Sequence, residues 1–130
     1  MNGQSNTNTA EESFSLVKHA KSFVHAGRGV KVVLKTTHNA WVQICIFIAA
    51  VALGIYVQLA YLEWIMIIFA SGLVFTAEAF NTAIEIDIDL TSPEYHPFAR
   101  DTKDVAAGAV LIASVSAAII GIMIFAHHLA

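Results

Sequence analysis

Residues 65–86 read IMIIFASGLVFTAEAFNTAIEI, and the predicted architecture depends on whether they cross a membrane. Its first 13 residues, 65–77, carry no charge, whereas the remainder introduces Glu78, Asn81 and Glu85. An uncharged run of 13 residues is too short to cross a hydrocarbon core of about 30 Å, so the segment spans a membrane only if it continues to about residue 86. Both carboxylates then lie within or beside the bilayer, where ionisable side chains indicate functional sites.

Two longer apolar runs flank this stretch. Residues 40–60 contain no charged side chain over 21 positions, and residues 105–126 contain none over 22. The whole chain of 130 residues is 57% hydrophobic and 13% charged, with mean hydropathy +0.66. One core of this size cannot bury so much apolar surface, which argues against an ordinary cytosolic enzyme. The sequence therefore predicts an all-α integral membrane protein with spans over about 40–60, 62–86 and 105–126.

The N-terminal part of the chain is polar and then basic. Residues 1–13 are of low complexity, and we expect a disordered tail there. Residues 14–38 carry apolar side chains at helical spacing, with cationic or titratable side chains roughly opposite. These are Lys18, Lys21, His25, Arg28, Lys31 and Lys35. We expect an amphipathic helix on an anionic membrane surface; a solvated helix packed on a protein core is the alternative.

The distribution of Lys and Arg predicts the orientation. Five of the seven precede residue 40, and none occurs in the turn at 58–63. The positive-inside rule places the N-terminus in the cytoplasm, the turn outside, and the 87–104 loop in the cytoplasm again. The net charge of −3 gives no reason to expect a nucleic-acid partner. The single cysteine, Cys45, lies in an apolar run, where packing is a simpler role than redox chemistry.

A row of polar side chains continues the central span. Glu78, Asn81, Glu85 and Asp89 are spaced 3, 4 and 4 apart, which places them on one face of a helix. Measured from Glu63 at about 1.5 Å per residue, Glu78 lies roughly 22 Å into the membrane and Glu85 roughly 33 Å, at the cytoplasmic edge. One carboxylate is then at the depth of a lipid head group, and the other is accessible to a water-soluble cosubstrate. Hydrogen bonding between neighbouring helices is the purely structural alternative.

The cytoplasmic loop adds groups suited to phosphate binding. They are His96, Arg100, Lys103 and Asp104, of which the cations would contact phosphate oxygens. The chain contains no GxxxxGK[ST] motif and no kinase-type glycine loop. A nucleotide would therefore be bound by a different architecture.

Three motifs carry a resemblance to a known family. The run EAFNTAIE at 78–85, the tripeptide EYH at 94–96 and the run KDVAAGAV at 103–110 resemble the signature of the small integral-membrane bacterial lipid kinases, diacylglycerol kinase and undecaprenol kinase. The stretch KSFVHAGRG at 21–29 resembles the undecaprenol-type branch, and the likeness extends from about residue 14 to 125. We therefore identify the domain as 14–130.

The resemblance implies both an assembly and an activity. The assembly is a homotrimer of three-span subunits with a cytoplasmic surface helix, in the bacterial plasma (inner) membrane, with active sites shared between neighbours. The activity is ATP- and Mg²⁺-dependent transfer of the γ-phosphoryl group to a membrane lipid hydroxyl. The N-terminal stretch slightly favours undecaprenol over diacylglycerol as the acceptor.

The resemblance also implies roles for residues on the central span. Glu78 would be the general base on the lipid hydroxyl, Asn81 would orient the site, and Glu85 would hold the Mg²⁺ bound to the ATP phosphates. This division suits phosphoryl transfer, which depends on positioning, charge neutralisation and a nearby base.

Further residues match the nucleotide-binding positions of the family. Asp89 and Glu94 match positions near the sugar and base of the nucleotide. Lys103 would contact phosphate, with Asp104 positioning it.

One position departs from the family pattern. The family has an acidic metal ligand before the first span, in a Glu-x-Asn pattern, whereas residues 37–39 here read THN. Asn39 matches but Thr37 does not, and a hydroxyl is a weaker ligand than a carboxylate for a hard cation. A noncatalytic lipid-binding homologue is therefore one alternative. A small oligomeric channel is another, although spans 40–60 and 105–126 carry no ionisable group to continue a polar path.

Overall fold

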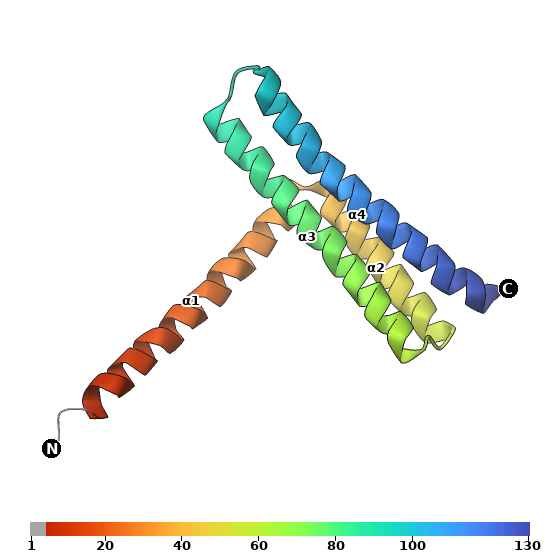
Figure 1. The fold of residues 1–130 in the computed structure, drawn as a ribbon, viewed down its shortest axis with the longest axis horizontal. Coiled ribbons are helices and arrows are strands. Elements are labelled where there is room, and N and C mark those ends of the chain that lie inside the picture. The colour runs from red at the N-terminus through yellow and green to blue at the C-terminus, as the bar shows by residue number, and fades with distance from the viewer. Residues whose placement is uncertain (1–4) are drawn as a thin grey trace. The chain divides into compact units, whose positions relative to one another are not determined.

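The computed structural model describes residues 5–130, with side chains from Val17 onward. These residues form four helices, α1 (Ser5–Thr36), α2 (His38–Tyr56), α3 (Tyr61–Thr91) and α4 (Pro97–Leu129) (Figure 1). Helices α2, α3 and α4 are each long and apolar enough to cross a membrane. The all-helical fold with three such helices is thus confirmed. Residues 1–4 of the expected tail at 1–13 lie outside the described residues, and the division at residue 14 stays a prediction.

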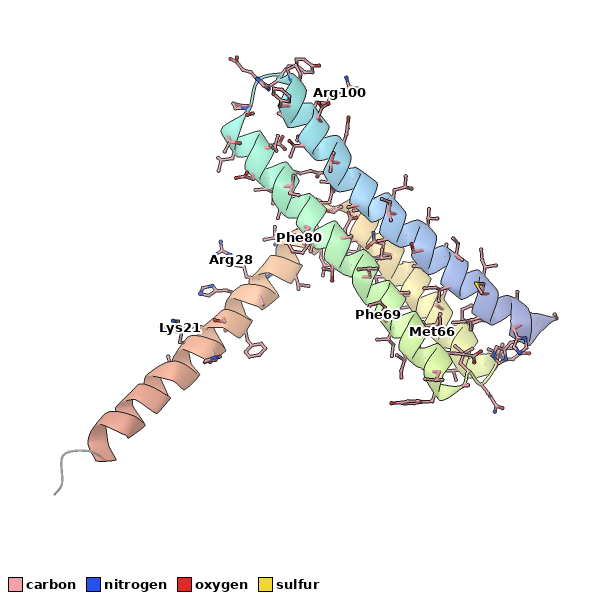
Figure 2. The ribbon with its side chains drawn as sticks, in the orientation of Figure 1. Lys21, Arg28, Met66, Phe69, Phe80 and Arg100 are labelled. Atoms are coloured by element: carbon pink, nitrogen blue, oxygen red, sulfur yellow. The ribbon has the colours of Figure 1, made fainter. Side chains whose placement is uncertain are left out.

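Helix α1 belongs largely to a unit of its own, residues 1–32, and is described by itself. It begins at Ser5, earlier than the surface helix expected at 14–38. Its described side chains up to Val32 are all exposed. Lys21 and Arg28 lie along α1 in Figure 2. Val24 follows Lys21 by three residues and precedes Arg28 by four, so this apolar side chain lies on the same face of the helix as the two basic ones. The separation into apolar and basic faces is incomplete, and the surface-helix role stays a prediction.

Helices α2 and α3 are joined by a tight turn at their expected outer ends. Gln58 adopts a positive φ of 58°, and the backbone N–H of Leu59 donates to the carbonyl of Gly54 over 3.0 Å. A Cβ on Gly54 would lie 2.8 Å from Leu59 Cδ1 and 2.9 Å from Trp64 Cη2. The close approach of the turn to α2 therefore requires glycine there.

Helices α3 and α4 form the most extensively packed pair. Their connection is shorter than the expected 87–104 loop, because α3 continues to Thr91 and α4 begins at Pro97. Proline suits the first turn of a helix, since its φ is already helical and no intrahelical N–H is needed there. The side chain of His96 caps this start by accepting from the N–H of Phe98 over 3.3 Å. Hydropathy marks where the apolar run ends, but the helices extend further, so Arg100 and Lys103 lie on α4 rather than in a loop.

Part of the exposed surface of α3 is apolar. Met66, Phe69 and Phe80 project from it (Figure 2) and are exposed, Phe69 to 70% and Phe80 to 67%. The buried core is correspondingly small, with Leu59, Ile67 and Ile124 at its centre. Apolar surface of this extent is stable against lipid or other chains, as a membrane protein requires.

Candidate active site

Three polar residues lie on the buried face of α3. Glu78 and Thr82 are each 1% exposed and Asn81 is 7% exposed, and among the side chains described they are the buried polar or charged ones. Two of them belong to the row predicted from the spacing of acidic and amide residues. Glu85 follows on the same face and is half-buried, and Asp89 is exposed. The row thus runs from the interior to the α3–α4 connection.

The partner of Glu78 comes from the neighbouring helix α2. The Nε2 of Gln43 donates to Glu78 Oε2 over 3.1 Å, while the oxygen of the same amide, Gln43 Oε1, is buried without a hydrogen-bond partner. Gln43 was not among the residues predicted from the sequence, because a neutral amide does not interrupt an uncharged span. The available signal was a strongly polar side chain within the run 40–60.

The next turn of α3 holds an amide–carboxylate pair. The Nδ2 of Asn81 donates to Glu85 Oε1 over 3.0 Å, the contact that a spacing of four residues on a helix allows. Asn81 Oδ1 is buried without a partner. The amides of Gln43 and Asn81 therefore both direct an N–H group to a carboxylate and retain a buried, unused oxygen.

Thr37 lies against α3 through a pair of hydroxyls. The Oγ1 of Thr82 donates to the backbone carbonyl of Glu78 over 2.9 Å, and the Oγ1 of Thr37 is 2.9 Å from that of Thr82. A hydroxyl has one proton, so Thr82 accepts from Thr37. Thr37, which the resemblance alone matches to the family's acidic ligand, thus adjoins the row and joins the start of α2 to α3.

A charged pocket of about 320 Å³ lies at the α3–α4 connection. Lys103 forms an ion pair with Asp89, and the Nε of Arg100 is 3.6 Å from Asp104 Oδ2. Asp104 therefore pairs with Arg100 rather than with Lys103. The pocket's charged or titratable lining is Asp89, Glu94, His96, Arg100, Lys103 and Asp104. These are the groups that the sequence assigned to nucleotide and phosphate.

An apolar cavity of about 520 Å³ lies between α2, α3 and α4. Its walls are aliphatic and aromatic side chains together with Ser71, Ser114 and Gln43. Gln43 is therefore shared by this cavity and by the buried cluster around Glu78.

The oxygen atoms around Glu85 fit Mg²⁺ as part of a metal–nucleotide complex. Among the described residues, no three His, Cys, Asp or Glu side chains come together as a metal site. Mg²⁺ at nucleotide sites is commonly held by one or two carboxylates, with phosphate and water completing the shell. The Glu85 carboxylate and the unpartnered Asn81 Oδ1 are hard oxygen donors of this kind.

Comparison with protein families matches residues 24–125 to the family described as prokaryotic diacylglycerol kinase. The chain belongs to this family. Every site residue described above falls within the matched range. The chain is 42% identical to an undecaprenol kinase of Bacillus subtilis over 105 residues, which cover 81% of this chain and 85% of the relative. It is 35% identical over 101 residues to a diacylglycerol kinase of Synechocystis, and these residues cover 77% of this chain and 58% of that relative. A diacylglycerol kinase of Helicobacter pylori is 36% identical over 75 residues, which cover 57% of this chain and 59% of that relative.

Proposed function

We propose that this member of the family is an ATP- and Mg²⁺-dependent kinase that phosphorylates the hydroxyl of a membrane lipid. The observation that carries the proposal is the continuous row from the buried Glu78 to the exposed Asp89 on one membrane-length helix. A lipid hydroxyl reaches the interior end of this row from the bilayer. A nucleotide reaches the other end from water.

Glu78 acts as the general base. It accepts the proton of the lipid hydroxyl, the hydroxyl oxygen bonds to the γ-phosphorus, and the bond from phosphorus to the leaving oxygen of ADP breaks. Asn81 orients Glu85 through the 3.0 Å hydrogen bond. When bound, Mg²⁺ neutralises phosphate charge, and Glu85 together with Asn81 Oδ1 would hold it.

The charged pocket at the α3–α4 connection binds the nucleotide. Lys103 leaves its ion pair with Asp89 and contacts a phosphate of the nucleotide instead. Asp89 is then available to the sugar of the nucleotide, and Glu94 adjoins the base. Asp104 orients Arg100 toward the same pocket. Exposed ion pairs contribute little to stability, so exchanging a carboxylate for a phosphate is energetically accessible.

We favour undecaprenol as the acceptor, because the relative that matches this chain over 85% of its own length is an undecaprenol kinase. Diacylglycerol is the second candidate, from the names of the other relatives. A homotrimer with shared active sites would cover exposed apolar faces such as that of Phe69 and Phe80. We place the protein in the bacterial inner membrane, with the N-terminus and the charged pocket in the cytoplasm.

A noncatalytic lipid-binding protein is the second candidate function. It is favoured by Thr37, whose hydroxyl is engaged with Thr82 where the family has a carboxylate. A channel is disfavoured, because α2 carries no Asp, Glu, His, Lys or Arg between Ala40 and Tyr56 that could extend a polar path beyond Glu78.

Purified protein in detergent, supplied with γ-labelled ATP and Mg²⁺, tests the activity against undecaprenol and diacylglycerol in parallel. We expect label in the lipid extract, with faster incorporation into undecaprenol. Folded protein that labels neither lipid would exclude the kinase and favour the noncatalytic alternative.

Matched variants on α3 test the assignment of the base. Glu78→Gln is expected to lower turnover by about 10²- to 10⁴-fold with little change in the KM for ATP. Glu85→Gln should instead raise the KM for Mg-ATP. Asp87→Asn is the control, since Asp87 is exposed and lies off the row. Near-normal turnover of Glu78→Gln at saturating lipid would show that another group is the base.

A further inference from the structure

Gln43 is the one member of the amide–carboxylate cluster of Gln43, Glu78, Asn81 and Glu85 that α2 supplies. Glu78, Asn81 and Glu85 all lie on α3, where their mutual spacing is set by one helix. Gln43 instead reaches across to Glu78 Oε2 over 3.1 Å. It therefore holds the carboxylate from a second direction that α3 does not supply.

A carboxylate held by one oxygen presents the other in a defined direction. Rotation about the terminal bond of glutamate is soft, so a buried Glu78 without a partner would sample several orientations. The hydrogen bond from Gln43 engages Oε2 and leaves Oε1 for a proton donor. Catalysis by a general base is sensitive to such placement, because misplacing a group by about 1 Å can lower a rate about 100-fold.

The surroundings of Gln43 also set the direction from which the lipid hydroxyl approaches Glu78. Gln43 lines the apolar cavity between α2, α3 and α4, while its amide nitrogen contacts Glu78. The side chain thus lies between the apolar space and the carboxylate, where a hydroxyl on an apolar chain would meet the base.

Simple helix–helix adhesion does not account for this residue well. Gln43 Oε1 is buried without a partner, and an unsatisfied buried acceptor opposes folding. Between α2 and α3, the hydroxyl pair of Thr37 and Thr82 already provides a polar connection.

We propose that Gln43 is a positioning residue for phosphoryl transfer, which holds Glu78 Oε2 so that Oε1 faces the hydroxyl of the acceptor lipid. This inference rests on the proposed kinase function. Gln43 exchanges no proton and contacts no phosphate. Its effect reaches the reaction only through Glu78, so it should disappear when Glu78 no longer acts as a base.

A double-mutant cycle tests this dependence. Gln43→Met keeps a side chain of similar length but removes the donor, and we expect kcat to fall about 10- to 100-fold while the KM for Mg-ATP stays unchanged. In a Glu78→Gln background the same substitution should cause no further loss, because its target is already gone. An equal fold-loss in both backgrounds would overturn the proposal and indicate a structural role.

Rescue and control variants complete the experiment. Gln43→His retains an N–H donor of similar reach and should recover part of the lost kcat. Ser116→Ala removes an exposed hydroxyl of α4 that donates to the carbonyl of Ile112 and does not line the cavity, and it should leave kcat unchanged. If Gln43→Met fails to fold, Gln43→Asn, whose amide is too short to reach Glu78, should show the same kcat loss. If the wild-type protein is active and neither Gln43→Met nor Gln43→Asn lowers kcat, the role of Gln43 is overturned while the kinase function stands. If the wild-type protein is inactive, the kinase function is overturned and this inference with it.

Discussion

Replacing Thr37 by glutamate tests whether this chain has lost a metal ligand. Thr37 is half-buried, and its hydroxyl donates to Thr82, which in turn donates to the backbone of Glu78. Glutamate at position 37 removes the first of these hydrogen bonds and adds a carboxylate beside the row on α3. The substitution therefore has two opposing consequences, one for stability and one for metal binding.

The effect on stability follows from the lost contact. A typical intramolecular hydrogen bond contributes about 1 kcal/mol, and the added negative charge near Glu78 and Glu85 opposes folding further. Without Mg²⁺ and nucleotide we expect the free energy of unfolding of Thr37→Glu to fall by about 1–2 kcal/mol. Bound Mg-ATP should recover this loss, because a ligand that binds only the folded state stabilises it.

The effect on metal binding has the opposite sign. An additional carboxylate favours Mg²⁺, and we expect half-maximal activity at about 10-fold lower Mg²⁺, which corresponds to about 1.4 kcal/mol. The assay is lipid phosphorylation titrated with Mg²⁺ at constant ATP, together with thermal unfolding with and without Mg-ATP. Thr37→Gln is the matched control, since it has the same length but no charge and should lose stability without gaining Mg²⁺ affinity.

The two variants together decide whether position 37 lies beside the metal. If Thr37→Glu and Thr37→Gln show the same Mg²⁺ dependence while both remain folded, position 37 does not adjoin the metal. The correspondence of residues 37–39 with the Glu-x-Asn pattern would then be wrong.

Three further predictions address packing, topology and nucleotide binding. Gly54→Ala should lower the free energy of unfolding by about 1–2 kcal/mol in a denaturation assay, because the added methyl meets Leu59 and the ring of Trp64, whereas Gly72→Ala, with nothing within 4 Å, should not. In a cysteine-free background, an impermeant thiol reagent applied to intact cells should label a cysteine at the exposed Ala60 but not one at the exposed Ser22; the reverse pattern would contradict the orientation. Lys103→Met should raise the KM for ATP with a smaller change in the KM for lipid, and an unchanged KM for ATP would remove Lys103 from the nucleotide site.

Much of this molecule could be predicted from its sequence. Apolar runs of sufficient length indicated three membrane-length helices, because a bilayer leaves few other structures for such a run. The shared face of Glu78, Asn81 and Glu85 followed from a spacing of three and four, since a helix has one periodicity. The contact from Asn81 to Glu85 is local to α3 and needed no tertiary information. The family was likewise identifiable from contiguous motifs.

Contacts between helices were decided by the tertiary structure. Gln43 meets Glu78, Thr37 meets Thr82, and Lys103 meets Asp89 only because α2 and α4 have a particular rotation and register against α3. Side-chain packing sets these two quantities, and the interlocking of the turn with Gly54 is one of the contacts that determine them. Periodicity along one helix contains no information about its rotation against another. For that reason the row of carboxylates was visible in the sequence, whereas the amide that holds its innermost member was not.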